Sequence, residues 1–133
     1  MSNLVPILLV DDNDAFVSAC AISLESSGFD VSQAYGGQEA VDQCAFRKFA
    51  LAIVDLNMPE LDGAATIGAL LARTPTMKII AISGGMLSPH FAKLAALGVR
   101  HFISKPFRLE NLLADIRDLL DPIVRMELSG QAA

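Results

Sequence analysis

The stretch that decides the fold is residues 55–63, which read Asp-Leu-Asn-Met-Pro-Glu-Leu-Asp-Gly and directly follow the apolar run 51–54. An apolar run of this length is typical of a strand buried on both faces of a parallel sheet. The Met-Pro pair prevents a helix from starting at once, because proline lacks a backbone N–H and restricts the residue before it. We therefore expect Asp55 to lie at the carboxyl edge of a sheet, where open α/β sheets bind ligands.

Polar side chains also end or follow three other apolar runs. Asp11 and Asp12 follow the first run of the chain, Ser83 ends a later one, and Lys105 follows the last. If the strands are parallel and neighbours, their carboxyl ends share one edge of the sheet. The pattern thus predicts that these four side chains gather around Asp55.

Strand-like and helix-like segments alternate along the chain, which predicts an α/β fold with a parallel sheet. We expect strands at residues 5–10, 30–35, 51–54, 78–83 and 99–104, the second of them at an edge. The first, second and last helices are expected over 14–26, 38–47 and 109–120. The third is expected to begin at an Asp62 cap and to end at Thr74-Pro75. The fourth is expected to have Pro89 in its first turn and to end at Gly98. Asn13 is the expected cap of the first helix and Gly28 its stop, whereas Arg108 is a weak cap for the last.

Length and composition predict one domain over residues 1–121, followed by a short tail, 122–133, and no output domain. Hydrophobic residues make up 53% of the 133, as a doubly covered sheet requires. The net charge of −5, without a basic run, argues against direct nucleic-acid binding. The longest apolar stretch, residues 4–10, is too short to span a membrane and lacks a signal peptide's basic flank. Cys20 and Cys44 lie on separate predicted helices and are expected to be small buried side chains in a cytoplasmic protein.

The three clustered acids indicate a cation site. Carboxylates that share a shallow site repel each other unless a cation intervenes, and hard oxygen ligands at an open edge suit Mg²⁺. A carboxylate beside Mg²⁺ is also a competent nucleophile towards phosphorus. Lys105, the Ser83 hydroxyl and the Gly84 N–H are expected to bind phosphoryl oxygens.

Together these residues resemble the receiver domains of bacterial two-component response regulators, over about residues 4–121. The matching motifs are Leu9-Val10-Asp11-Asp12, residues 55–63, Ile82-Ser83-Gly84 and Lys105-Pro106-Phe107. The resemblance implies a doubly wound (βα)₅ fold, with a five-stranded parallel sheet of flavodoxin-like order 2-1-3-4-5.

The resemblance also implies a role for each residue of the site. Asp55 would be the phosphoacceptor. The Mg²⁺ ligands would be Asp12, Asp55 and the Asn57 backbone carbonyl, with Asp11 acting mainly through water. The phosphoryl-binding and switch residues would be Ser83, Gly84, Lys105 and Phe102, and Pro59, Gly63 and Pro106 would shape the site.

A receiver of this kind would be a phosphorylation-activated switch, charged by a histidine kinase or a histidine phosphotransfer protein. It would catalyse only its own phosphoryl transfer and a slow self-dephosphorylation. The donor would dock on Asn13, Ala15, Phe16, Pro106 and Phe107. The output partner would bind the fourth helix, fifth strand and fifth helix, a face that includes Lys93, Arg100, His101 and Arg108.

Several alternatives stay open at this stage. The chain could serve instead as a phosphate shuttle or sink in a relay, or as a non-phosphorylated pseudo-receiver scaffold. A phosphatase of the haloacid-dehalogenase type needs a second Asp two residues after its nucleophile, where this chain has Asn57. A flavodoxin-like FMN binder needs a Ser/Thr-rich loop after the first strand, where this chain has Asp-Asp-Asn-Asp. His90 and His101 lack partners at metal-ligand spacing, so we expect each to be exposed or locally hydrogen-bonded.

Overall fold

Five parallel strands form one sheet in the order β2-β1-β3-β4-β5, as the sequence predicts. The computed structural model describes residues 4–57, 63–84 and 88–120, without the side chains of residues 88–90. The strands are β1 (Val5–Val10), β2 (Phe29–Ala34), β3 (Leu51–Asp55), β4 (Lys78–Ser83) and β5 (His101–Ser104). The helices are α1 (Asp14–Ser26), α2 (Gly37–Phe46), α3 (Gly63–Arg73), α4 (Ser88–Ala96) and α5 (Leu109–Leu120).

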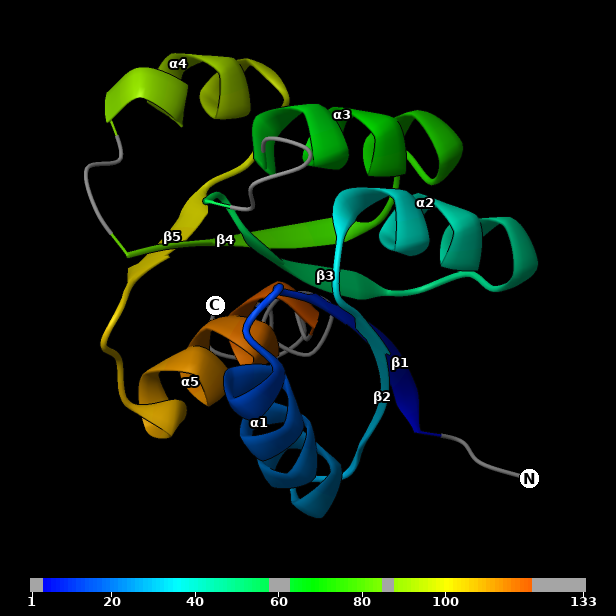
Figure 1. Ribbon diagram of the computed structural model, residues 1–133, viewed down its shortest axis with the longest axis vertical. Helices are drawn as coiled ribbons and strands as arrows, with labels where there is room; N and C mark the ends of the chain where they lie inside the picture. The colour runs from blue at the N-terminus through cyan, green and yellow to red at the C-terminus, as the bar shows by residue number, and fades with distance from the viewer. Residues whose placement is uncertain (1–3, 58–62, 85–87, 121–133) are drawn as a thin grey trace, which may run out of the picture.

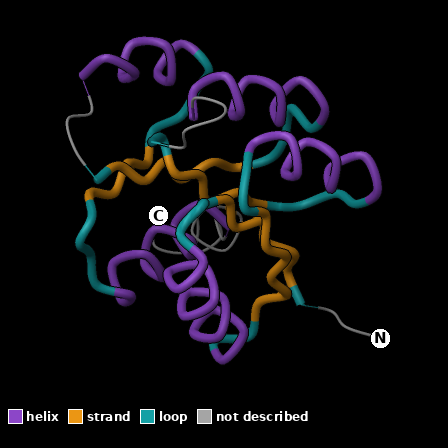
Figure 2. The backbone as a smooth tube through the Cα atoms, viewed as in Figure 1, coloured by secondary structure: helices purple, strands orange, loops and turns teal. Residues whose placement is uncertain are grey.

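Helices cover both faces of the sheet. Figures 1 and 2 show α2, α3 and α4 on one face and α1 and α5 on the other. Alternate residues of each central strand enter the two layers: Leu8 and Val10 of β1 join the first core, and Ile7 and Leu9 join the second. Every residue of β3 is buried, which explains why this strand is apolar throughout until Asp55.

Three strands differ from their predicted bounds. β3 extends one residue further than predicted, to Asp55. β2 ends and β5 begins at other residues than predicted because the chain uses their backbone groups elsewhere. Tyr35 was expected in the second strand, but its N–H donates to Glu39 Oε1 (2.8 Å) in the first turn of α2. The fifth strand was expected to begin at Val99, whose N–H instead donates to the Leu94 carbonyl (3.0 Å). Gly98, with φ of +92°, makes this turn possible, since a left-handed residue after a helix suits glycine.

Other local predictions are confirmed. Asn13 Oδ1 accepts a hydrogen bond from the Phe16 N–H (3.1 Å), and Gly28 follows the helix with φ of +97°. α5 has its predicted bounds, and its leucine and isoleucine residues all pack into the core shared with α1. Asp62, the expected cap of α3, lies outside the described residues, as do Pro122 and the tail.

Both cysteines are buried and free, as expected. Burial, together with the nearby charge of Asp11, raises the pKa of the Cys20 thiol to about 11. In the part of the chain that the structure describes, no helix combines the length and apolar character needed to cross a bilayer.

Gly63 begins α3 directly beneath the end of β3, and this contact yields a stability prediction. A Cβ added there would overlap Leu56 Cα and lie 2.9 Å from the Asp55 carbonyl oxygen. Gly63→Ala should therefore lower the free energy of unfolding by about 1–3 kcal/mol, because backbone atoms cannot move aside cheaply. Urea denaturation measures the change.

Gly68 of the same helix is the matched control. Its added Cβ would meet only Leu97 Cδ1, at 4.0 Å, so Gly68→Ala should stabilise the protein by about 0.5–1 kcal/mol. Equal effects of the two substitutions would contradict the close approach at Gly63.

Candidate functional site

The sheet register places Asp11 and Asp55 side by side. Val10 pairs with Val54, so the next residue of each chain segment lies at the shared carboxyl edge. Asp11 is 1% exposed and Asp55 is 6% exposed, whereas Asp12 faces solvent. One carboxylate oxygen from each of the three lies within 4.8 Å of the others, which confirms that the acids share a site.

Backbone N–H groups fix one oxygen of each buried carboxylate. Asp11 Oδ1 accepts from the Asn13 N–H at 2.9 Å, and Asp55 Oδ1 accepts from the Asn57 N–H at 3.0 Å. Aspartate commonly bonds the backbone two residues later in this way. The two side chains are thus oriented by their own loops, and each keeps its Oδ2 for another partner.

That other partner is Lys105, the residue that follows β5. Its Nζ lies 2.8 Å from Asp11 Oδ2 and 3.7 Å from Asp55 Oδ2. The Lys105 N–H also donates to the Ser83 carbonyl at 2.8 Å, and the peptide bond to Pro106 is cis. The expectation that Lys105 faces the acidic cluster is confirmed.

Ser83 and Gly84 lie at the end of β4, next to β3. Asp55 pairs with Ile82, so Ser83 is the following residue on the neighbouring strand, and it is 2% exposed. Gly84 is exposed, and a Cβ added there would meet no atom of the described residues within 4 Å.

Electrostatics leave the cluster short of positive charge. Burial raises the pKa of the Asp55 carboxyl above 3.8 and the charge of Asp11 raises it further, while the Asn57 N–H and Lys105 act in the opposite direction. Within the described part of the chain, the Lys105 ammonium lies within 4 Å of Asp11 and Asp55, and Asp12 is the third carboxylate of the group, so the ionised cluster carries a net charge of about −2. A set of hard oxygen donors with excess negative charge fits Mg²⁺.

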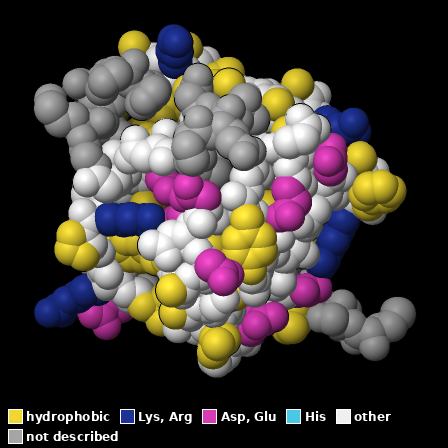
Figure 3. Space-filling model, viewed as in Figure 1, with side chains coloured by type: hydrophobic (Ala, Val, Ile, Leu, Met, Phe, Trp, Pro, Cys, Tyr) yellow, Lys and Arg dark blue, Asp and Glu magenta, His cyan; other side chains and the backbone are white. Residues whose placement is uncertain are grey.

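The same edge is visible on the molecular surface. In the space-filling view, Asp and Glu side chains gather near the middle of the face, over the ends of the central strands, with a basic side chain beside them (Figure 3).

One contact of the site was missed by the sequence analysis. Lys105 Nζ lies 4.3 Å from the centroid of the Phe16 ring, which in turn packs edge-on against Phe107, with centroids 5.7 Å apart. The sequence places both rings on the expected donor-docking surface, and Phe107 also in the Lys105-Pro106-Phe107 motif. Nothing in their sequence spacing to Lys105 signals a ring beneath the ammonium.

Among the residues assigned to the output face, Lys93 lies on α4 and His101 on β5, while Arg100 and Arg108 lie in the loops just before β5 and α5. Lys93, Arg100 and Arg108 are exposed, and Phe102 is half-buried with its ring 5.2 Å from that of Phe91. His101 Nε2 lies 3.1 Å from Asp118 Oδ2, which is the local hydrogen bond expected of it. Pro59 lies outside the described residues, and so does the side chain of His90.

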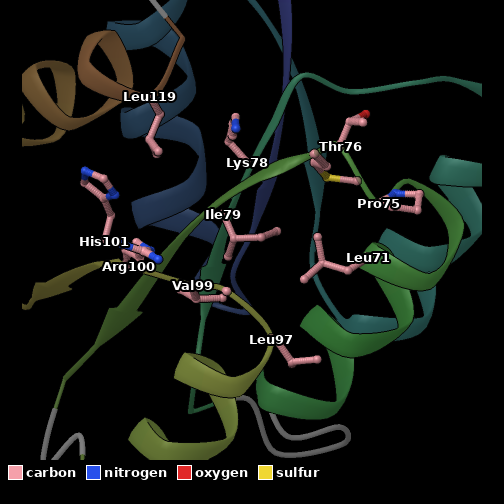
Figure 4. A pocket seen from close by; sticks show the side chains of 12 residues that line it. Leu71, Pro75, Thr76, Lys78, Ile79, Leu97, Val99, Arg100, His101 and Leu119 are labelled. Atoms are coloured by element: carbon pink, nitrogen blue, oxygen red, sulfur yellow. The ribbon is translucent and has the colours of Figure 1, made fainter. Parts of the chain in front are cut away.

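A cavity of about 540 Å³ lies at the opposite edge of the sheet, away from the acids. Figure 4 shows Leu71, Leu97, Val99 and Ile79 on its apolar side and Lys78, Arg100 and His101 around it. Lys78 and His101 begin their strands, so this cavity is at the amino edge of the sheet, away from the acidic cluster at the carboxyl edge.

Comparisons with known proteins agree with the fold and the site. Residues 7–117 match the family described as the response regulator receiver domain. Response regulator MprA of Mycolicibacterium vanbaalenii is 33% identical over 130 residues, which cover 97% of this chain and 56% of that protein. This chain spans about half the length of the curated relatives it matches, between 49% and 56% for those compared.

Solved structures show the same likeness. A CheY-like receiver domain protein from Methanospirillum hungatei has a TM-score of 0.86 at 28% identity, over 90% of this chain and 95% of that one. A response regulator from Burkholderia pseudomallei, solved with a phosphorylated aspartic acid, calcium ion and citrate, has a TM-score of 0.79 at 25% identity, over 95% and 72% respectively. The chain belongs to the response regulator receiver domain family, whose members are phosphorylation-activated switches of two-component signalling and not conventional enzymes.

The raised pKa of Asp55 predicts a pH-dependent gain in stability for Asp55→Asn in metal-free buffer. A raised pKa means that the folded state binds the proton more tightly than the unfolded chain, so ionisation of Asp55 costs stability. The wild type should therefore lose stability relative to the Asp55→Asn variant as pH rises from below about 3.9, the unfolded value, through the higher folded pKa. Chemical denaturation in EDTA across this range measures the difference.

Asp12→Asn is the matched control, because Asp12 is exposed and loses little hydration on folding. At neutral pH, its effect on the free energy of unfolding should be smaller than that of Asp55→Asn. An Asp55→Asn variant no more stable than wild type at neutral pH would contradict the argument.

Proposed function

We propose that this chain accepts a phosphoryl group on Asp55 and thereby changes the face it presents to a protein partner. The observation that carries the proposal is the arrangement of Asp55 itself. Its Oδ1 is held by the Asn57 N–H, while its Oδ2 lies 3.7 Å from the Lys105 ammonium at an open edge of the sheet. A carboxylate oriented in this way suits nucleophilic attack on phosphorus, and the nearby Lys105 ammonium can bind the phosphoryl group after its transfer.

Mg²⁺ is the proposed cofactor of this reaction. We assign as its ligands Asp12, Asp55 and the Asn57 backbone carbonyl, with Asp11 acting mainly through water. Bound there, the ion would supply positive charge that neutralises phosphoryl oxygens. Support comes from the three carboxylates, which each place an oxygen within 4.8 Å of the others, and from the Burkholderia pseudomallei relative, whose structure holds a phosphorylated aspartic acid and a calcium ion.

The phosphoryl donor is proposed to be the phosphohistidine of a histidine kinase or a phosphotransfer protein. An Asp55 oxygen attacks phosphorus and forms the new P–O bond. The P–N bond breaks, its electron pair returns to the imidazole nitrogen, and that ring takes up a proton from water. Lys105, the Ser83 hydroxyl and the Gly84 N–H receive the phosphoryl oxygens.

The structure suggests how the added charge would reach the rest of the fold. Lys105 and Ser83 are joined by a backbone hydrogen bond of 2.8 Å, so a shift of either one affects the ends of both β4 and β5. Two new hydrogen bonds to a charged group contribute about 3–6 kcal/mol. Converting a 1:99 equilibrium to 99:1 needs about 5.5 kcal/mol, so these two bonds are of the right size.

Phe102 of β5 is proposed to respond to this shift, and α4, β5 and α5 to form the output face. The donor would dock on the start of α1, at Asn13, Ala15 and Phe16, together with Pro106 and Phe107. These partners would be met in the cytoplasm. Pro59, Gly63 and Pro106 are proposed to shape the loops around the site, and for Gly63 the close approach to Asp55 supports this.

Incubation with acetyl phosphate and Mg²⁺ tests the proposal. The intact protein should gain the mass of one phosphate, and Asp55→Asn should abolish the gain because the nucleophile is lost. Asp30→Asn, on the edge strand, is the matched control and should still be modified, since Asp30 pairs with Arg47 away from the site. Wild type that gains no phosphate under these conditions would favour the pseudo-receiver alternative.

A second experiment separates a switch from a shuttle or sink. Beryllofluoride mimics a phosphoryl group on Asp55 but cannot be passed to another protein. A switch should therefore bind its output protein only after beryllofluoride treatment. A shuttle should instead pass label from phosphorylated Asp55 to a histidine phosphotransfer protein without treatment-dependent binding of a third protein.

A further inference from the structure

We propose that Phe16 is a positioning residue for phosphoryl transfer, acting through Lys105. The ammonium has three N–H donors, and three groups surround it in the structure. Two carboxylate oxygens lie 2.8 and 3.7 Å from Nζ, and the centroid of the Phe16 ring lies 4.3 Å away. A cation over an aromatic face at this distance is attracted to the ring's negative quadrupole.

The Phe16 ring is itself held in place. Phe107 packs against it at an interplanar angle of 82°, an arrangement that aromatic pairs favour. Phe107 follows Lys105 by two residues, so the loop that carries the ammonium also supports the ring beneath it. Asn13 holds the other side of the contact, because it caps the first turn of α1 that carries Phe16.

This contact limits where the ammonium can lie. The Lys105 side chain is only 26% exposed, and its long stem would otherwise adopt several rotamers. A ring face attracts the ammonium without offering a competing anionic oxygen. The ring therefore keeps Lys105 close to Asp55 Oδ2, while the donors that do not bond Asp11 Oδ2 stay available to a phosphoryl group.

The inference rests on the proposed phosphorylation of Asp55 for one of its two readouts. The first readout needs no phosphoryl group: the ε-methylene protons of Lys105 should be shifted upfield by the Phe16 ring in the proton NMR spectrum. Phe16→Leu should abolish the shift and Phe16→Tyr should retain it, because tyrosine keeps the ring face. Phe46→Leu, at a position that is 91% exposed, should leave the shift unchanged.

The second readout is the rate of modification by acetyl phosphate. Phe16→Leu should slow it by about two- to fivefold, the range that a cation–π contact of this exposure supplies, and Phe16→Tyr should restore it. In the Lys105→Met background the same Phe16→Leu change should have no further effect, since a residue acting through Lys105 has nothing left to position.

The outcomes are separable. Lys105 protons without an upfield shift in wild type would overturn the inference, as would an unchanged or faster rate for Phe16→Leu. An equal loss of rate with and without Lys105 would show that Phe16 serves only packing. If wild type takes up no phosphate, the proposed function fails, while the NMR shift still decides whether the ring holds the ammonium. If Lys105→Met is too slow to follow, the Phe16→Leu and Phe16→Tyr variants decide through shift and rate together.

Discussion

Two buried carboxylates at the ends of neighbouring central strands are the constraint on which this structure depends. Burying an ionised group without a partner is costly, and Asp11 and Asp55 lie next to each other. The fold compensates with a backbone N–H for each and with one shared ammonium, Lys105, which lies 94 residues from Asp11 in the chain. The acids of β1 and β3 therefore require the loop after β5 to close over the edge of the sheet.

The charge of the carboxylates is only partly compensated, and the remaining negative charge matters for function. A buried ion pair contributes little to stability unless both partners are fully hydrogen-bonded, and here a single cation serves more carboxylates than it can neutralise. The raised pKa of Asp55 reports the same imbalance. A site left short of positive charge favours cations and reacts strongly to a change in its own charge, which is what a switch driven by phosphorylation and metal requires.

The sequence was sufficient where a motif, the end of an apolar run or the chemistry of one side chain determines the structure. The strand order follows from the family resemblance, and the meeting of the acids with Lys105 follows from the ends of parallel strands. The Asn13 cap and the full length of α5 follow from side-chain chemistry and apolar spacing. The bounds of β2 and β5 did not follow, because the N–H groups of Tyr35 and Val99 are taken by neighbouring helices. Whether such an N–H bonds to the sheet or to a helix depends on tertiary geometry.

The Phe16 ring was beyond sequence reasoning for a related reason. Its neighbours Lys105 and Phe107 come from the other end of the chain, and an apolar residue on the inner side of α1 is expected in any case. Yet the chemical choice at this position matters. A carboxylate there would compete with phosphoryl oxygens for the Lys105 donors, and an aliphatic side chain would offer the ammonium no attraction. An aromatic face attracts the ammonium without competing for its donors. It holds Lys105 near Asp55 through a contact that is too weak to prevent the ammonium from donating hydrogen bonds to a phosphoryl group.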